Sequence, residues 1–119
     1  MTGAAGERTG RCACGSVRYT LTAEPQEVVL CHCEDCRHAT GATAVTWLLL
    51  PLGALVFRKG TPASRESSPD VTRVFCRGCG TQLAFRDARD TSIAVTLGSL
   101  DDPSGFAPTQ QRYEAQKLS

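Results

Sequence analysis

The chain has 119 residues, which is enough for one domain with its own core and too few for two. Its 13 basic and 12 acidic side chains are scattered and give a formal net charge of +1, so no basic stripe predicts a nucleic-acid partner. Residues 1–8 lack the apolar core of a secretory signal, and no later segment is suited to span a membrane. We therefore expect a cytoplasmic protein without a membrane partner.

The predicted elements begin after a polar N-terminus, residues 1–9, which we expect to be flexible. Residues 16–21 alternate between apolar and polar side chains, a period that predicts a half-buried strand. A short helix fits residues 34–40, because acidic residues occupy its first turn and Gly41 can end it. Residues 1–41 therefore predict one strand and one helix.

The segment from residue 43 to residue 105 is predicted to consist of strands and turns. Residues 43–50 are almost continuously apolar, which is typical of a central strand covered on both faces, and Pro51 can end it. Further strands are predicted at 55–59, 71–75, 82–86 and 92–97. Turn-forming residues occur at 60–62, 67–70 and 101–105. We expect a mainly β domain at residues 10–109 and a polar tail, 110–119, that could form a second helix.

All seven cysteines fall into three tight groups. An odd total argues against a complete disulfide framework, and short spacings such as Cys-x-x-Cys are typical of metal ligation. The groups are Cys12 with Cys14; Cys31, Cys33 and Cys36; and Cys76 with Cys79. The sequence therefore predicts one four-thiolate site and one three-thiolate site.

The four-thiolate site is predicted to be structural zinc. Residues 76–80 have the composition of a zinc knuckle, in which glycines let the backbone turn around Cys76 and Cys79. Cys12 and Cys14 are two residues apart in an extended segment, so both point to the same side and can complete a tetrahedral set. The alternative is that these are disulfides or ordinary buried cysteines.

The three-thiolate site, Cys31, Cys33 and Cys36, leaves one coordination position open, which is the arrangement of catalytic zinc. Cys33 and Cys36 share a face if a helix starts here, and the helix N-terminus and Arg37 would lower the pKa values of the thiols. The alternative is an empty or redox-sensing cysteine cluster.

Four polar residues surround this trio. His32 points away from its flanking cysteines in an extended segment, so it is predicted to be a polar neighbour of the site or a surface residue and not a ligand. Glu34 and Asp35 could relay protons, but both are also ordinary acidic residues of a first helical turn. His38 is predicted to be solvated, and Trp47 to be a core residue.

Four segments together resemble the glutathione-dependent formaldehyde-activating enzyme family, which also includes centromere protein V. They are CACGSVRY at 12–19, CHCEDCR at 31–37, FCRGCGTQL at 75–83 and LDDP at 100–103. The resemblance runs from residue 10 to about 109. It implies coiled, mostly antiparallel β-sheets, with Cys12, Cys14, Cys76 and Cys79 on a structural zinc and Cys31, Cys33 and Cys36 on a catalytic one.

The resemblance also implies an activity: condensation of glutathione with formaldehyde to S-(hydroxymethyl)glutathione, formally the reverse of a carbon–sulfur lyase reaction. Arg37 and Arg77 could then pair with the glutathione carboxylates. Residues 67–69 and Arg73 also resemble the family, although a turn and a solvated strand residue would explain them equally well. The chain departs from the family near its end, where relatives often carry a histidine and a tryptophan and residues 109–113 read TQQRY.

A second interpretation belongs to another functional class. A non-catalytic zinc module could act as a glutathione carrier, a redox sensor or a protein-interaction domain. In that case, substitution of Cys33 would alter stability or redox response without abolishing any turnover. The open three-thiolate spacing favours the enzyme, with zinc as cofactor and a small thiol and an aldehyde as substrates.

Overall fold

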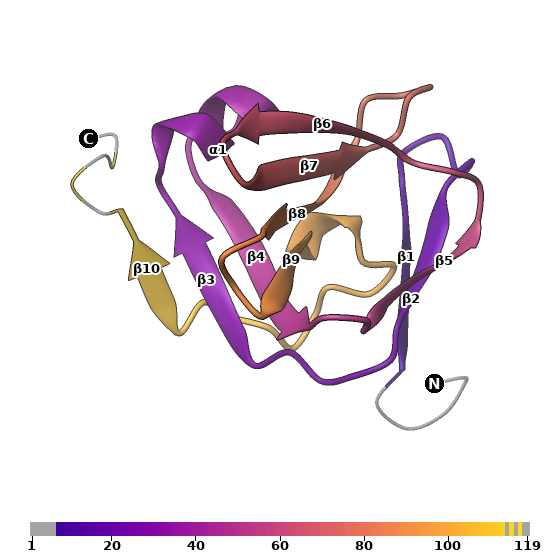
Figure 1. Ribbon diagram of the computed structural model, residues 1–119. Helices are drawn as coiled ribbons and strands as arrows, with labels where there is room; N and C mark the ends of the chain where they lie inside the picture. The colour runs from indigo at the N-terminus through magenta and orange to yellow at the C-terminus, as the bar shows by residue number, and fades with distance from the viewer. Residues whose placement is uncertain (1–6, 114, 116, 118–119) are drawn as a thin grey trace.

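Ten strands, one α-helix and one short 3₁₀-helix make up the described part of the chain, residues 7–113, 115 and 117, in this computed structural model (Figure 1). In chain order they are β1 (Arg8–Arg11), β2 (Arg18–Leu21), β3 (Glu27–Cys31), α1 (Glu34–Thr40), β4 (Val45–Pro51), β5 (Leu55–Lys59), β6 (Ala63–Ser68), β7 (Val71–Phe75), β8 (Gln82–Asp87), β9 (Ser92–Thr96), η1 (Leu97–Ser99) and β10 (Gln110–Arg112). The predicted mainly β architecture is confirmed.

The strands form two sheets. Strands β1, β2 and β5 make a three-stranded sheet, and the other seven form a sheet in the order β10-β3-β4-β9-β8-β7-β6. Neighbouring strands are antiparallel except β10, which pairs in parallel with β3 at the edge of the large sheet. In Figure 1 the small sheet stands at one side of the large one.

The centre of the large sheet is buried on both faces. Side chains alternate along each strand, so each face carries its own set. One face contributes to a core shared with the small sheet, and this core includes Tyr19, Leu21, Val28, Leu48, Leu50 and Val95. The opposite face carries a second cluster, which includes Val29, Cys31, Trp47, Leu49 and Ala94, together with Cys36 of α1. Strand β4 supplies both clusters, which confirms the prediction that its apolar run is a central strand covered on both faces.

Helix α1 begins and ends where the sequence predicts. Cys33 caps its N-terminus, and the Cys33 sulfur accepts a hydrogen bond from the backbone amide of Cys36. Gly41 ends the helix in the left-handed conformation, at φ 77°, and its amide donates to the carbonyl of Arg37. The helix is seven residues long, so its position depends on these caps and on the burial of Cys36.

Four strands were not predicted: β1, β3, β6 and β10. Strands β1, β6 and β10 lie at sheet edges and consist largely of polar residues. They lack an alternating hydrophobic pattern, and only their hydrogen bonding to a neighbouring strand makes them strands. Strand β3 is a short apolar run that lacks alternation. Periodicity therefore found the central strands and missed most of the edges.

Strands also occur at both predicted domain boundaries. Strand β1 starts at Arg8, inside the segment 1–9 that was expected to be flexible. In the tail, residues 110–112 form a strand where a helix was considered, and residues 114, 116, 118 and 119 lie outside the described residues. Strand β6 also extends to Ser68, so the turn predicted at 67–70 is confined to its end, where Asp70 has φ 68°. No helix in the described part of the chain is long and apolar enough to cross a membrane.

Candidate functional site

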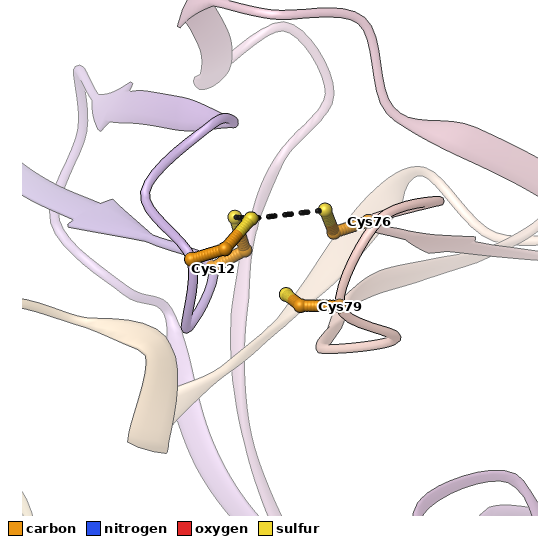
Figure 2. A group of neighbouring side chains, drawn as sticks. Cys12, Cys76 and Cys79 are labelled. Atoms are coloured by element: carbon orange, nitrogen blue, oxygen red, sulfur yellow. Dashed lines mark hydrogen bonds between the residues drawn. The ribbon is translucent and has the colours of Figure 1, made fainter.

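The first cysteine cluster joins the two sheets. Cys12 and Cys14 lie in the loop between β1 and β2 of the small sheet, and Cys76 and Cys79 lie in the turn between β7 and β8 of the large sheet. The four sulfurs are all within 4.8 Å of one another. Figure 2 shows the labelled cysteines converging from opposite loops. The structure thus brings together the four residues that the sequence assigned to one site.

The loops around this cluster favour the ionised form of two of its thiols, Cys12 and Cys79. Burial raises the pKa of Cys12, but hydrogen bonds from the Val17 amide and neighbouring polar groups outweigh it and lower this pKa to about 7. Hydrogen bonds to Thr81 lower the pKa of Cys79 to about 5. A group of four such sulfurs could hold a metal ion with no open position.

The second cluster lies on the other face of the large sheet. Cys31 ends β3, Cys33 caps α1 and Cys36 lies in its first turns, and their sulfurs are within 4.8 Å of one another. Cys31 and Cys36 are buried, and Cys33 is half-buried. The hydrogen bond between Cys31 and Cys36 lowers the pKa of the first and raises that of the second. All seven cysteines are free thiols in the structure, with no disulfide among them.

Arg73 connects this trio to the large sheet. Its side chain is 3% exposed, and its Nη2 lies 2.8 Å from Asp35 Oδ2 and 3.3 Å from Cys36 Sγ. Its Nε donates to the hydroxyl of Ser67, which in turn donates to Asp35 Oδ2. The interpretation of Arg73 as a solvated strand residue is therefore wrong, because β7 turns this side chain inward beneath α1.

Asp35 takes a more specific part than an ordinary acidic residue of a first helical turn. Burial raises the pKa of its carboxyl. The hydrogen bond from Arg73 and the charge of the Arg73 guanidinium have a larger, opposite effect, so the pKa of Asp35 lies below its usual value. The carboxylate therefore stays ionised at neutral pH. Asp35 and Ser67 are partners of Arg73 that the sequence alone did not pair.

A cavity of about 220 Å³ opens beside the trio. Its lining includes Cys31, Cys33, Cys36 and Arg73, a set of apolar side chains and a charged rim. The apolar side chains are Val29, Trp47, Leu49, Val71 and Phe85. The rim consists of the charged residues Asp35, Asp87, Arg89, Asp90 and Arg112, together with the polar Tyr113. An apolar floor with a few convergent polar groups is the usual character of a small-molecule site.

The two arginines predicted to bind carboxylates lie outside this lining. Arg77 is exposed in the turn of the first cluster, and Arg37 is half-buried on α1. Arg89 and Arg112 lie at the rim instead, where Arg89 pairs with Asp87 at 2.6 Å. Sequence reasoning missed both because Arg89 depends on the β8–β9 connection and Arg112 on the pairing of β10 with β3.

The two histidines have different surroundings. His32 is 5% exposed, and its Nε2 lies 2.7 Å from Gln111 Oε1, so it contacts β10 and not the sulfurs of the trio. This matches the prediction of a polar neighbour of the site. His38 is exposed on α1, 3.8 Å from Glu34 Oε2, and forms an ion pair when it is protonated.

The comparison with known proteins follows the same residues. The sequence profile of the glutathione-dependent formaldehyde-activating enzyme (GFA) family matches residues 7–116. The chain belongs to this family. The match extends the GFA region past both predicted boundaries, in agreement with β1 and β10. Within the matched region, Arg112 and Tyr113 contribute to the cavity wall.

Two individual proteins resemble this GFA-family chain. An uncharacterized lyase of Schizosaccharomyces pombe is 29% identical over 86 residues, which cover 66% of this chain and 57% of the relative. The chain thus spans little more than half of that relative. A crystal structure of a Rhodobacter sphaeroides protein has the same fold, with a TM-score of 0.69 and 20% identity over 87% of this chain and 98% of that one.

Proposed function

We propose that this chain is a zinc-dependent enzyme of carbon–sulfur lyase type that condenses glutathione, or a related thiol, with formaldehyde or another aldehyde. The observation that carries the proposal is the position of the three-sulfur cluster, whose members Cys31, Cys33 and Cys36 all line the cavity. Membership of the GFA family supports the same reaction class. The lyase name of the fungal relative agrees with it.

The donor chemistry fits zinc at both clusters, because thiolates are soft ligands and the sulfurs already lie within 4.8 Å of one another. Cys12, Cys14, Cys76 and Cys79 would hold a structural ion, and Cys31, Cys33 and Cys36 a catalytic ion. When bound at the trio, zinc supplies one thing to the chemistry: it favours the thiolate form of a substrate thiol at neutral pH.

The chain's own residues position the reactants and handle the proton. The apolar floor of the cavity, with Trp47 and Phe85, limits the water around the reacting groups. Asp35 is held ionised by Arg73, so it is a poor proton donor at neutral pH, and water would protonate the alkoxide oxygen to give the new hydroxyl. Proximity provides the remaining catalysis.

The rim suggests how a tripeptide thiol is held. We assign the contacts to glutathione carboxylates to Arg89 and Arg112, because both line the cavity that Arg37 and Arg77 do not reach. Arginine binds carboxylates with two parallel hydrogen bonds, so each contact would also orient the substrate. Asp90, which also lines the cavity, would meet the glutathione ammonium group, whereas Asp87 is already paired with Arg89.

The test is the rate at which S-(hydroxymethyl)glutathione forms and breaks down at equilibrium, measured by NMR exchange. Zinc-loaded wild-type protein is expected to accelerate the exchange above the buffer rate, and Cys33→Ser to lose the acceleration. His38→Ala is the control, because it changes an exposed residue of the same helix. Wild-type protein that leaves the buffer rate unchanged would overturn this substrate pair and favour the carrier, sensor or interaction module.

A further inference from the structure

Two buried hydrogen-bond donors of the cavity residues have no acceptor. Trp47 Nε1 and Arg73 Nη1 are enclosed, each residue being 2% exposed, and neither atom finds a partner among the described residues. Both residues line the cavity beside the three sulfurs. Buried donors are normally paired, so unpaired ones in a native structure call for a partner. A third such atom, Arg37 Nε, belongs to a residue outside the cavity lining.

The sheet register places both donors on one face. Arg73 pairs with Phe85, Phe85 with Ala94 and Ala94 with Leu49, in a line across four strands, and Trp47 is two residues from Leu49. Since side chains alternate along a strand, all five side chains face the same side of the sheet.

Phe85 lies between the two donor residues. Its ring meets the Trp47 ring edge-on, with centroids 4.7 Å apart, and the Arg73 guanidinium carbon lies 5.3 Å from its centroid. The donors are therefore held by packing on the same aromatic side chain. Rigid donors of this kind can stabilise a charge that develops during a reaction without reorganising.

Contacts of Arg73 with α1 hold its own free donor beside the thiols. Its Nη2 donates hydrogen bonds to Asp35 and Cys36, and its Nε donates to Ser67. Nη1 is therefore the one nitrogen of the planar guanidinium group without a partner in the described part of the chain. A lysine could contact Cys36 or a ligand, but its single ammonium could not reproduce this fixed division of donors.

We propose that Arg73 and Trp47 form a two-donor site for the oxygen of the aldehyde, an inference that rests on the proposed function. The thiolate sulfur forms a bond to the carbonyl carbon, and the π electron pair of the C=O bond moves onto oxygen. Arg73 Nη1 and Trp47 Nε1 donate hydrogen bonds to that oxygen as its negative charge grows. The oxygen then takes a proton and becomes the hydroxyl of the hemithioacetal, so the thiol proton is balanced and nothing is oxidised or reduced.

The kinetic test uses Trp47→Phe, which removes one N–H and keeps an aromatic ring, and Arg73→Lys, which keeps a charge and removes the fork. We expect kcat to fall about 10-fold in Trp47→Phe and about 100-fold in Arg73→Lys, while KM for the thiol stays within about two-fold. A variant that is folded and zinc-loaded yet keeps the wild-type kcat overturns the proposal, as does a loss confined to KM. If Arg73→Lys fails to fold, Trp47→Phe decides.

A second readout does not depend on turnover. Trp47 is the only tryptophan, so the ¹⁵N-labelled protein gives a single indole N–H signal. Glutathione with formaldehyde is expected to shift this signal downfield, whereas S-methylglutathione, which lacks the hydroxyl oxygen, should leave it near the position seen with glutathione alone. Equal shifts with both compounds would mean that no acceptor oxygen reaches the indole, which overturns the proposal.

The two failures remain distinguishable. If wild-type protein does not accelerate the exchange, the proposed function fails. Suppose instead that wild-type protein accelerates the exchange, both variants keep the wild-type kcat, and the indole signal shifts equally with and without the hydroxyl oxygen. The proposed function then stands and the donor site fails. His38→Ala, exposed and outside the cavity lining, again serves as the control for both measurements.

Discussion

At the scale of single residues, burial separates two ion pairs that look alike by distance. Arg73–Asp35 and Arg8–Glu24 both have N–O distances of 2.8 Å. The Arg73 side chain is 3% exposed, however, whereas that of Arg8 is 31% exposed. A charge taken out of water depends on its partner far more than one that water can still solvate. Arg73 thus depends on Asp35 for its burial beneath α1.

We therefore expect Asp35→Asn to lower the free energy of unfolding by about 2–3 kcal/mol, less than for a fully enclosed pair because Asp35 is half exposed. Glu24→Gln, the matched control, should cost less than about 1 kcal/mol. Urea denaturation of the zinc-loaded proteins measures both. Equal, small losses would show that the buried guanidinium is satisfied without the carboxylate.

At the scale of elements, the short helix α1 holds the second cluster through its caps. Two of the three sulfurs, Cys33 and Cys36, belong to its first turn and cap, and Gly41 closes it. A seven-residue helix has little stability of its own, so each cap contributes a substantial part of its order. The geometry of the trio is therefore sensitive to the end of the helix as well as to its beginning.

Gly41→Ala tests this coupling. An added Cβ meets no atom within 4 Å, so the cost comes from the left-handed backbone alone, and we expect a loss of about 1 kcal/mol with weaker metal binding at the trio. Gly98→Ala is the control, because its Cβ is also unobstructed and its φ is not positive. Thermal unfolding and metal titration provide the readouts. Identical behaviour of the two variants would contradict a role for this cap.

At the scale of the whole molecule, the first cluster connects the small sheet to the large sheet. Its cysteines come from the β1–β2 loop of the small sheet and the β7–β8 turn of the large one. The second cluster, by contrast, lies within one sheet and the helix beside it. Loss of a metal ion should therefore disrupt the fold at the first cluster and only the site at the second.

Cys76→Ser is expected to leave the protein unfolded or aggregated, because structural zinc contributes on the order of 10 kcal/mol in small domains. Cys33→Ser should keep a cooperative thermal transition and lose about one zinc per chain. Circular dichroism and metal analysis of the purified proteins compare them. A soluble, normally folded Cys76→Ser protein would argue against a structural role for the cluster.

The sequence by itself determined the features that depend on neighbouring residues. Cysteine spacing defined both clusters, Glu34 and Gly41 marked the ends of α1, and alternation or apolar runs located the central strands. These features are local, because a helix cap or a strand face is decided within a few residues. Even the union of two distant cysteine pairs was predictable, since two ligands in each pair leave a tetrahedral site half filled.

Only the tertiary structure decided which side chains complete the site. From the sequence alone, Arg73 could equally be an exposed strand residue. The fold places β7 between β6 and β8, and there the Arg73 side chain contacts Asp35 of α1. Arg112 reaches the cavity only because β10 adds to β3 in parallel, and the unpaired donors of Trp47 and Arg73 exist only once both are buried. Burial and pairing between distant strands are properties of the assembled sheet, and no local pattern encodes them.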